Sequence, residues 1–212
     1  MKVIFLLLVS FSLGAESDAE QAFTKIYESW PWDDTGFSMS GSQIEITGEY
    51  VEFLQDFIRK NNIHSVVDIG CGDWAFSRYI DWNGIQYTGV DIVKFVIERN
   101  QKLFAGPSIT FIYGDARSME LPEADLLVCK DVFQHLSNAD IMLILKQQQK
   151  FKHCLFTNFV NPTTLTINNC DISAGEFHYV DLATPPFTQK GRQVLIFTAI
   201  APKQIFYIIH PD

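Results

Sequence analysis

Carboxylate side chains lie at the ends of three predicted strands, next to a turn that contains two glycines. Asp68 stands two positions before Gly70, Gly72 follows, and Asp91 and Asp115 come at or just after the next two strand-like runs. Open parallel sheets bind ligands at the carboxyl ends of their strands, so these groups are expected to share one site. Carboxylates there can accept hydrogen bonds from ribose hydroxyls and attract a positive charge. The pattern therefore predicts a site for a nucleoside-containing ligand.

The element that positions these groups begins with a β-branched, apolar run at residues 66–69, which is typical of a buried parallel strand. Gly70 and Gly72 end this run, and they allow a tight turn with a ligand close to the backbone. Residues 75–80 then predict the opening of a helix whose N–H groups point back over the turn. Strand, glycine turn and helix form the first half of a nucleotide-binding unit.

Two cofactors fit the glycine spacing. Gly70-x-Gly72-x-x-Ala75, with Asp91 about twenty residues further on, matches the alanine-ended dinucleotide fingerprint, so the glycines alone leave NAD open. Asp68 separates the two cofactors, because its carboxylate would repel a pyrophosphate and attract the ammonium and sulfonium groups of S-adenosylmethionine (SAM). Asp91 does not discriminate, since it could bind the ribose of either ligand.

At these residues the chain resembles the class I SAM-dependent methyltransferases, whose first motif runs acidic-x-Gly-x-Gly-x-Gly. Trp74 occupies the third glycine position, so the next segment must accommodate an indole. The resemblance implies that Asp115 accepts a hydrogen bond from the adenine amino group, that the N–H of Ala116 reaches the ring, and that the carbonyl of Lys130 meets the cofactor's ammonium. For Asp115 a helix N-cap is the structural alternative. The predicted cofactor-binding residues are Asp68, Gly70, Cys71, Gly72, Asp91, Ile92, Asp115, Ala116 and Lys130.

A second signal follows the apolar run 126–129, where polar residues begin abruptly at the carboxyl end of a predicted strand. Small-molecule methyltransferases commonly carry a short segment ending in His at this place, and Asp131-Val-Phe-Gln-His135 is similar to it. The resemblance implies that Asp131 and His135 face the methyl acceptor. His135 could take a proton from the acceptor at neutral pH. The alternatives are a histidine bonded within the core and an aspartate that caps the backbone. His178 and Tyr179 are weaker candidates for the base.

The resemblance implies an α/β three-layer sandwich with a seven-stranded, mostly parallel sheet and an antiparallel last strand. The residues support this: Thr47 is expected to cap an amphipathic helix, and further helices are predicted over 93–104 and from 137 to about 150. The strand-like runs 193–199 and 204–209 have so short a link that they must pair antiparallel. A dinucleotide fold does not contain such a pair.

Two irregular segments are candidates to cover the site. Residues 16–46 show no clear periodicity and suggest a loop anchored by Trp30 and Trp32. Either these tryptophans cap the core or the segment folds over the cofactor as a lid. Residues 177–187 are rich in aromatics and could form an extended wall over the acceptor. The methyltransferase-like domain itself is expected to span 47–212.

Residues 1–15 have the organisation of a secretory signal, with a charged start, a hydrophobic stretch and a small-residue cleavage site. The stretch is too short to cross a bilayer comfortably, so no stable membrane span is expected in the mature chain. A buried first element of a cytoplasmic domain and an uncleaved, membrane-retained signal are the alternatives. Export is favoured, although it would require SAM outside the cytosol.

Composition limits the partners. The 212 residues, 47% of them hydrophobic, suffice for one globular domain with a sizeable core. A formal net charge of −9, with scattered basic residues, argues against nucleic acid as a partner. The four cysteines lack metal-ligand spacing and no metal is implied. Cys71 lies in the glycine turn and Cys129 at the end of an apolar strand. The resemblance makes the strands before these two residues neighbours, so the thiols could approach each other, but reduced, mostly buried thiols are favoured.

Three function classes are consistent with the sequence, and one is favoured. It is a SAM-dependent methyltransferase that acts on a small-molecule acceptor, by a direct displacement in which orientation supplies most of the rate. A base is needed only if the acceptor is protonated. An exported, non-catalytic SAM-fold binding module would best explain the N-terminal signal. An NAD-dependent oxidoreductase is least favoured, because no Ser/Tyr/Lys arrangement typical of such enzymes is visible. The sequence does not identify the acceptor or the oligomeric state.

Overall fold

The computed structural model describes residues 17–29, 44–160, 168–198 and 201–210. Its strands are β1 (Ser65–Ile69), β2 (Gln86–Asp91), β3 (Ile109–Tyr113), β4 (Ala124–Lys130), β5 (Phe151–Phe159), β6 (Arg192–Thr198) and β7 (Pro202–Ile209). Its α-helices are α1 (Asp18–Glu28), α2 (Ile44–Lys60), α3 (Lys94–Phe104) and α4 (Asn138–Leu145). Short 3-10 helices are η2 (Ser77–Tyr79), η3 (Phe133–His135) and η4 (Gln148–Lys150).

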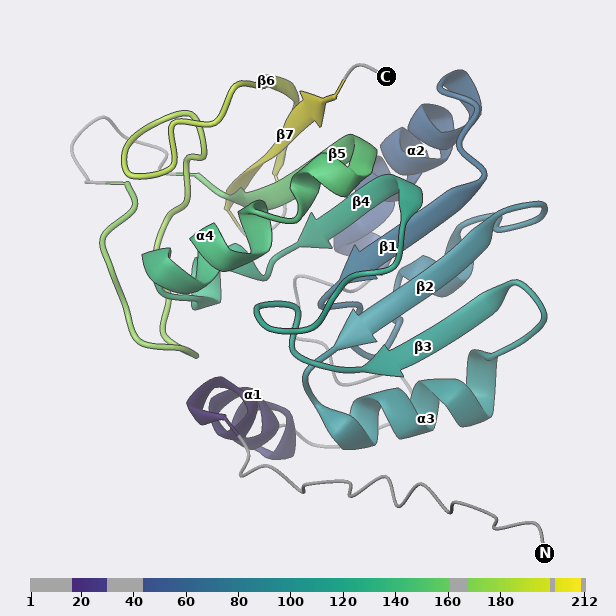
Figure 1. The fold of residues 1–212 in the computed structure, drawn as a ribbon. Coiled ribbons are helices and arrows are strands. Elements are labelled where there is room, and N and C mark those ends of the chain that lie inside the picture. Colours follow the sequence, from purple (N-terminus) through teal and green to yellow (C-terminus); the bar gives the residue numbers. More distant parts are fainter. Residues whose placement is uncertain (1–16, 30–43, 161–167, 199–200, 211–212) are drawn as a thin grey trace, which may run out of the picture.

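The seven strands form one sheet in the order β3-β2-β1-β4-β5-β7-β6 (Figure 1). Strands β1 to β5 run parallel to one another, whereas β7 is antiparallel to both of its neighbours, β5 and β6. The chain order reverses between β1 and β4, and such a reversal opens a crevice at the carboxyl ends of the strands. The predicted fold class, including the antiparallel last strand β7, is confirmed.

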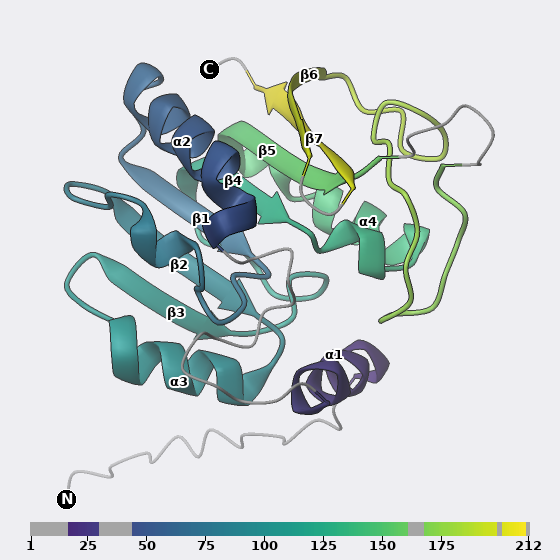
Figure 2. The same ribbon diagram turned by 180° about the vertical axis from the view of Figure 1, so that it is seen from behind.

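Helices cover both faces of the sheet, with α2 and α4 on opposite sides (Figures 1 and 2). On the α2 side, side chains of α2 and α3 pack with aromatic residues that follow β1. On the α4 side, the core is completed by residues of the long segment before β6, namely Val180, Leu182 and Phe187. Because both faces are buried, the central strands are apolar almost throughout, as parallel strands require.

The segment after the glycine turn departs from expectation. Residues 75–80 do not open an α-helix but form only the single 3-10 turn η2. Trp74, at the third glycine position, takes a left-handed backbone conformation with φ of 61°. Its buried ring contacts those of Tyr87, Phe104 and Phe111. The Nε1 of Trp82 donates to the carbonyl of Ser77 at 2.8 Å. The aromatic residues therefore fill the core, and the chain folds around them instead of continuing as a helix.

Three helix boundaries also differ from the predictions. Helix α2 begins at Ile44, so the fully buried Thr47 lies inside it and is not its cap. Residues 18–28, predicted as part of a loop, form helix α1, whose N-cap Ser17 accepts from the N–H of Glu20. Helix α4 starts after the predicted cap Ser137 but ends at Leu145, short of 150. Beyond that end the Gln147 side chain bonds backbone groups of the loop between β3 and β4.

Two predictions concern residues that the structure does not describe. The signal segment 1–15 and the pair Trp30 and Trp32 lie outside the described residues. No helix among the described residues is long and apolar enough to cross a bilayer. The four cysteines are reduced, and all but Cys170 are buried, as expected.

Candidate functional site

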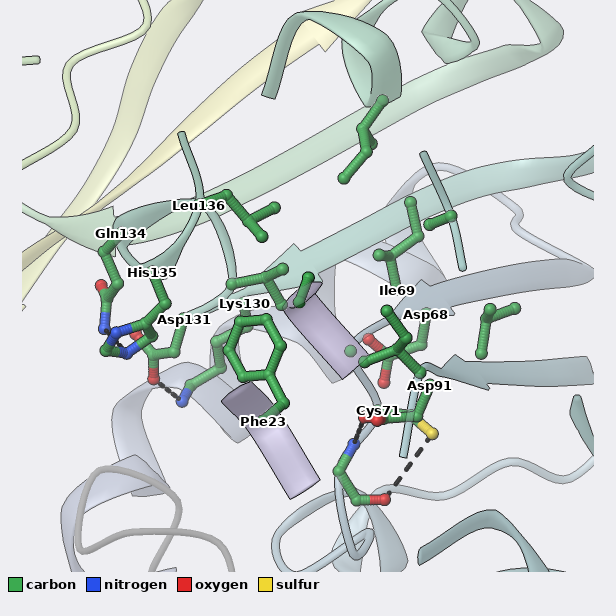
Figure 3. Close-up of a pocket in the computed structure, with 18 of the residues that line it drawn as sticks. Phe23, Asp68, Ile69, Cys71, Asp91, Lys130, Asp131, Gln134, His135 and Leu136 are labelled. Atoms are coloured by element: carbon green, nitrogen blue, oxygen red, sulfur yellow. Dashed lines mark hydrogen bonds and ion pairs between the residues drawn. The ribbon is translucent and has the colours of Figure 1, made fainter. Parts of the chain in front are cut away.

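A cavity of about 370 Å³ lies at the carboxyl ends of the parallel strands. Its volume is within the range of small-molecule and cofactor sites. Figure 3 shows its lining side chains, with Phe23 between a group around Lys130 and Asp131 and a group around Asp68 and Asp91. All eleven residues predicted for the site line this one cavity: Asp68, Gly70, Cys71, Gly72, Asp91, Ile92, Asp115, Ala116, Lys130, Asp131 and His135.

The glycine turn forms one end of the cavity. Gly70 and Gly72 have left-handed backbones, with φ of 68° and 55°. A Cβ atom at Gly70 would lie 2.2 Å from Cγ2 of Val132, so only glycine fits against the segment that follows β4. Oδ2 of Asp91 accepts the N–H of Gly72 at 3.0 Å, and its Oδ1 accepts the N–H of Val93 at 2.9 Å. Asp91 thus fixes the turn and still has lone pairs for ribose hydroxyls.

The two buried acids at this end carry less charge than the sequence suggests. Burial raises the pKa of Asp68 to about 7, although the Tyr87 hydroxyl, which donates to Asp68 at 2.7 Å, and the charge of Lys130 act in the opposite direction. Burial likewise raises the pKa of Asp91 to about 6, against its backbone hydrogen bonds. A cation placed between them would favour the ionised carboxylates. The site therefore takes on its full negative charge when such a ligand binds.

Asp115 is held differently from the other two acids. Arg117 donates to both carboxylate oxygens of Asp115, with Nη2 to Oδ2 at 2.6 Å. Burial acts to raise the pKa of Asp115, but the hydrogen bonds and charge of Arg117 hold it below its usual range. Its charge is therefore neutralised locally, and it adds little to the attraction of a cation. Asp115 does not cap an α-helix, because only a turn follows it.

Helix α1 closes one side of the cavity and was missed in the sequence. It crosses the edge of the sheet where the parallel strands end (Figures 1 and 2). The hydroxyl of Tyr113 donates to Glu20, and Nη2 of Arg117 donates to Oγ of Ser17 at 3.1 Å, which ties α1 to the end of β3. Four residues of α1 line the cavity, and their spacing is helical: Ala19, Phe23, Ile26 and Tyr27.

The opposite end of the cavity contains an ion-paired triad, defined here as Lys130, Asp131 and Lys203. Oδ2 of Asp131 lies 2.5 Å from Nζ of Lys130 and 2.6 Å from Nζ of Lys203. Burial alone would raise the pKa of Asp131, but the two ammonium groups lower it below its usual value. Asp131 is therefore a shared counter-ion and a poor proton acceptor. Lys203, at the start of β7, was not predicted as a site residue.

His135 is placed as a neutral imidazole at the edge of the cavity. Its Nδ1 lies 2.9 Å from the carbonyl oxygen of Glu176, and its Nε2 lies 3.3 Å from Nε2 of Gln134. The Gln134 amide is oriented by its Oε1, which accepts the N–H of Phe159 at 3.0 Å. These contacts assign the proton to Nδ1 and a lone pair to Nε2. Burial lowers the pKa of His135, so the ring is neutral and able to accept a proton at pH 7.

The segment between β5 and β6 holds this end in place. The side chain of Asn169 donates to the carbonyls of Asp181 and Pro185 and accepts the N–H of Asp181. His178, predicted as a reserve base, is buried between the carbonyl oxygens of Cys170 and Phe133, 2.5 and 3.1 Å from its ring nitrogens. It braces the loop and does not line the cavity. Of residues 177–187, which were predicted to form a wall over the acceptor, Phe177 lines the cavity. Its ring contacts that of His135.

The residues present fit SAM. The carboxylates of Asp68 and Asp91, the turn at Gly70 and Gly72 and the strand end at Lys130 all face the cavity, which is otherwise largely apolar. Acidic groups at one end suit an ammonium and a ribose, and apolar walls suit an adenine ring. Among the described residues no group of three His, Cys, Asp or Glu side chains is arranged to hold a metal ion.

Known proteins are similar to this chain. A family model described as "Methyltransferase domain" matches residues 66–151. The mitochondrial ubiquinone biosynthesis O-methyltransferase of Schizosaccharomyces pombe is 25% identical over 153 residues, which is 68% of this chain and 55% of that protein. The chain thus spans about half the length of this relative.

Solved structures share the fold. The N-methyltransferase NodS of Bradyrhizobium japonicum, crystallised with S-adenosylhomocysteine (SAH), has a TM-score of 0.67 at 14% identity, covering 92% of this chain and 100% of that one. The magnesium protoporphyrin IX methyltransferase of Synechocystis, also with SAH, has a TM-score of 0.60 at 14% identity, covering 92% and 96%.

Proposed function

We propose that this chain, which belongs to the class I SAM-dependent methyltransferases, transfers the methyl group of SAM to a small-molecule acceptor. The observation that carries this proposal is the single cavity at the β1/β4 crossover, where acidic groups at one end face a histidine and an ion-paired triad at the other. Neither the NAD-dependent oxidoreductase nor the non-catalytic binding module finds support in the similar proteins.

The acidic end would hold the cofactor. Asp91 is placed to accept the ribose hydroxyls, and Asp68, together with the carbonyl of Lys130, to meet the ammonium group. When bound, SAM supplies an electrophilic methyl group on a sulfonium. The glycine turn brings the backbone close to the ligand, and α1 shields it from water on the open side of the strands.

The opposite end would orient the acceptor. In a direct displacement most of the rate comes from holding the nucleophile in line with the methyl group, and the aromatic walls formed by Phe23, Phe159 and Phe177 serve this purpose. If the acceptor is protonated, Nε2 of His135 would take the proton, in place of the hydrogen bond that it accepts from Nε2 of Gln134. Asp131 would act by positioning the two lysines.

A small acceptor fits this geometry better than a macromolecule. The cavity is of small-ligand size and α1 forms part of its wall, which leaves little room for a polymer. The net charge of −9 disfavours nucleic acid. We also infer export through residues 1–15. Mass spectrometry of the N-terminus of protein from its native host tests this, and a chain that retains Met1 to Ala15 would contradict cleavage.

Calorimetric titration with SAM, SAH and NAD tests the proposed function. We expect micromolar binding of SAM and SAH and none of NAD. Incubation with methyl-labelled SAM and a panel of small phenols, amines and carboxylic acids should then yield a labelled product. Binding of NAD alone, or no binding of SAM and SAH at millimolar concentration, would overturn the proposal.

A further inference from the structure

We propose that the acceptor is a phenol whose hydroxyl group is bound jointly by Gln134 and His135, which makes Gln134 a further acceptor-binding residue. This inference rests on the proposed function, because it assigns the acceptor class at the same cavity. Both residues line the cavity and belong to the segment that follows β4. Their side chains lie on the side of Phe23 away from Asp68 and Asp91 (Figure 3).

The hydrogen bonds around the Gln134 amide determine which way it faces. Its Oε1 accepts the N–H of Phe159 at 3.0 Å, so its Nε2 is the atom that faces Nε2 of His135 at 3.3 Å. Nε2 of Gln134 can only donate, so Nε2 of His135 accepts, and Nδ1 carries the ring proton towards the carbonyl oxygen of Glu176. A hydrogen-bond donor and a hydrogen-bond acceptor therefore lie side by side at the cavity wall.

The backbone around these two residues holds the pair in place. Gln134 is 3% exposed, and its carbonyl oxygen accepts the N–H of His178 at 3.0 Å. The carbonyl oxygen of His135 accepts the N–H of Gly175 at 2.9 Å. Both residues are thus attached to the segment between β5 and β6, and Gln134 is also attached to β5 through Phe159. Groups fixed in this way suit ligand recognition, because little side-chain entropy is lost on binding.

A hydroxyl group matches both members of the pair. Its O–H can donate to Nε2 of His135 and its oxygen can accept an N–H of Gln134, in place of the direct hydrogen bond between the two side chains. The oxygen still has a second lone pair. In the transfer, that lone pair forms the bond to the methyl carbon while the carbon–sulfur bond breaks, the sulfur keeps the electrons of that bond, and the hydroxyl proton goes to Nε2 of His135.

Other nucleophiles match the pair less well. An amine nitrogen has a single lone pair, which cannot accept from Gln134 and attack the methyl group at the same time. A carboxylate has no proton to give at neutral pH, so Nε2 of His135 would have no role. An aliphatic hydroxyl does carry a proton, but it ionises far less readily than a phenol such as the tyrosine side chain, so a neutral imidazole removes that proton less easily.

Aromatic side chains at this end of the cavity favour a ring next to the hydroxyl. Phe23, Phe159 and Phe177 line the cavity. The centre of the Phe177 ring lies 5.8 Å from that of Phe159 and 5.9 Å from that of His135, yet Phe177 is 47% exposed. An aromatic acceptor would cover this apolar surface and gain ring–ring contacts that an aliphatic one cannot make. The hydroxyl is therefore expected on an aromatic ring, as in a phenol.

Three probes of similar shape test the acceptor class when they are titrated by calorimetry into the SAH-loaded protein at pH 7. They are p-cresol, p-toluidine and p-methylanisole, of which only p-cresol has an O–H group. We expect p-cresol to bind about tenfold more tightly than the other two and, with methyl-labelled SAM, to be methylated about tenfold faster than p-toluidine. Equal binding of the three probes, no binding of p-cresol at millimolar concentration, or faster methylation of p-toluidine would overturn the inference. Absence of SAH binding would instead remove the proposed function itself.

Gln134→Glu separates recognition of the acceptor from support of the backbone. The carboxylate keeps an acceptor for the N–H of Phe159 but has no N–H to donate to a phenol oxygen. We expect p-cresol affinity to fall about tenfold and SAH affinity to change less than about threefold. Gln149→Glu, which introduces the same charge at an exposed position of η4, should change neither. Thermal unfolding verifies that each variant is folded.

The pH profile of turnover is a readout that a purely structural role of Gln134 would not move. A carboxylate beside His135 favours the protonated ring, so the acidic limb of the profile should shift to higher pH in Gln134→Glu, by about one pH unit. Unchanged p-cresol affinity together with an unchanged profile in the folded variant would overturn the role of Gln134. If the variant does not fold, the comparison of the three probes on the wild-type protein still decides the acceptor class.

Discussion

The acidic and the basic ends of the cavity are held together by different means. At the glycine turn, Asp91 accepts N–H groups from its own turn and from the neighbouring one, so the carboxylate is fixed by local backbone. At the other end, Asp131 is fixed by two lysine side chains, one of them 72 residues away in the sequence. Local backbone contacts hold the acidic end without help from distant segments, whereas the ion pairs at the other end join β4 to β7.

Replacing Asp91, the carboxylate that is fixed by backbone N–H groups, should have the largest effect on cofactor affinity. Asp91→Ala takes away two acceptors for ribose hydroxyls and two for the backbone of the turn. With about 2 kcal/mol for each hydrogen bond to the ligand, SAH affinity should fall about 1000-fold, as measured by calorimetry. Glu98→Ala, which removes an exposed carboxylate on α3, is the control and should bind normally. Unchanged affinity in Asp91→Ala would show that the acidic end does not bind the ribose.

At the other end, His135→Gln should lower turnover about 100-fold and leave SAH affinity within about twofold, because the proposed function makes the imidazole a proton acceptor for the acceptor substrate and not a ligand of the cofactor. Steady-state rates with an acceptor from the panel, together with SAH titration, provide the measurement. Normal turnover would contradict a role for His135 as base.

The affinity for SAH should depend on pH through the ionisation of Asp68. A ligand with an ammonium group binds the ionised carboxylates better, so SAH affinity should fall as pH drops through the raised pKa of Asp68, about 7. At pH 6 a group with this pKa is ionised in about one molecule in ten, which predicts about tenfold weaker binding than at pH 8. Asp68→Asn should bind more weakly at pH 8 and lose most of this pH dependence. A flat profile in the wild type would show that Asp68 does not meet the ammonium.

The smallest effect is expected where α1 is anchored. Arg117 pairs with Asp115 and Asp140 and donates to Ser17, so Arg117→Met leaves two half-buried carboxylates without this partner. We expect a loss of about 1 kcal/mol, or about 2–4 °C in the melting temperature, and faster proteolysis within α1. Arg59→Met removes an exposed ion pair on α2 and should have no measurable effect. Equal behaviour of the two variants would argue against an anchoring role.

The acidic end could be predicted from the sequence because each of its residues lies near the carboxyl end of a strand. Asp68, Asp91 and Asp115 are neighbours in space because β1, β2 and β3 are parallel neighbours. Lys203 could not be found in this way, since its position depends on β7 lying beside β5 with the reverse direction. The residues that surround Lys203 are therefore determined by the order and direction of the strands, which no local sequence pattern gives.

Two local predictions failed for reasons of packing. The helix expected at residues 75–80 is replaced by a 3-10 turn, because Trp74 and Phe76 are drawn into the aromatic core. Helix α1 was not predicted, because its 11 residues belong to a stretch, residues 18–46, whose sequence as a whole shows no clear periodicity. Read separately, the apolar residues at 19, 23, 26 and 27 would have indicated one helical face.

The short turn η2 also determines which ligands the glycine turn can attract. Summed peptide dipoles at the start of a long helix create a partial positive charge that attracts phosphates. Between β1 and β2, all of which the structure describes, no α-helix aims its first turn at the cavity. A diphosphate bridge would therefore gain no electrostatic stabilisation there, and a sulfonium would meet no opposing field. Selectivity for the cationic nucleoside thus rests on the backbone path as well as on the aspartates.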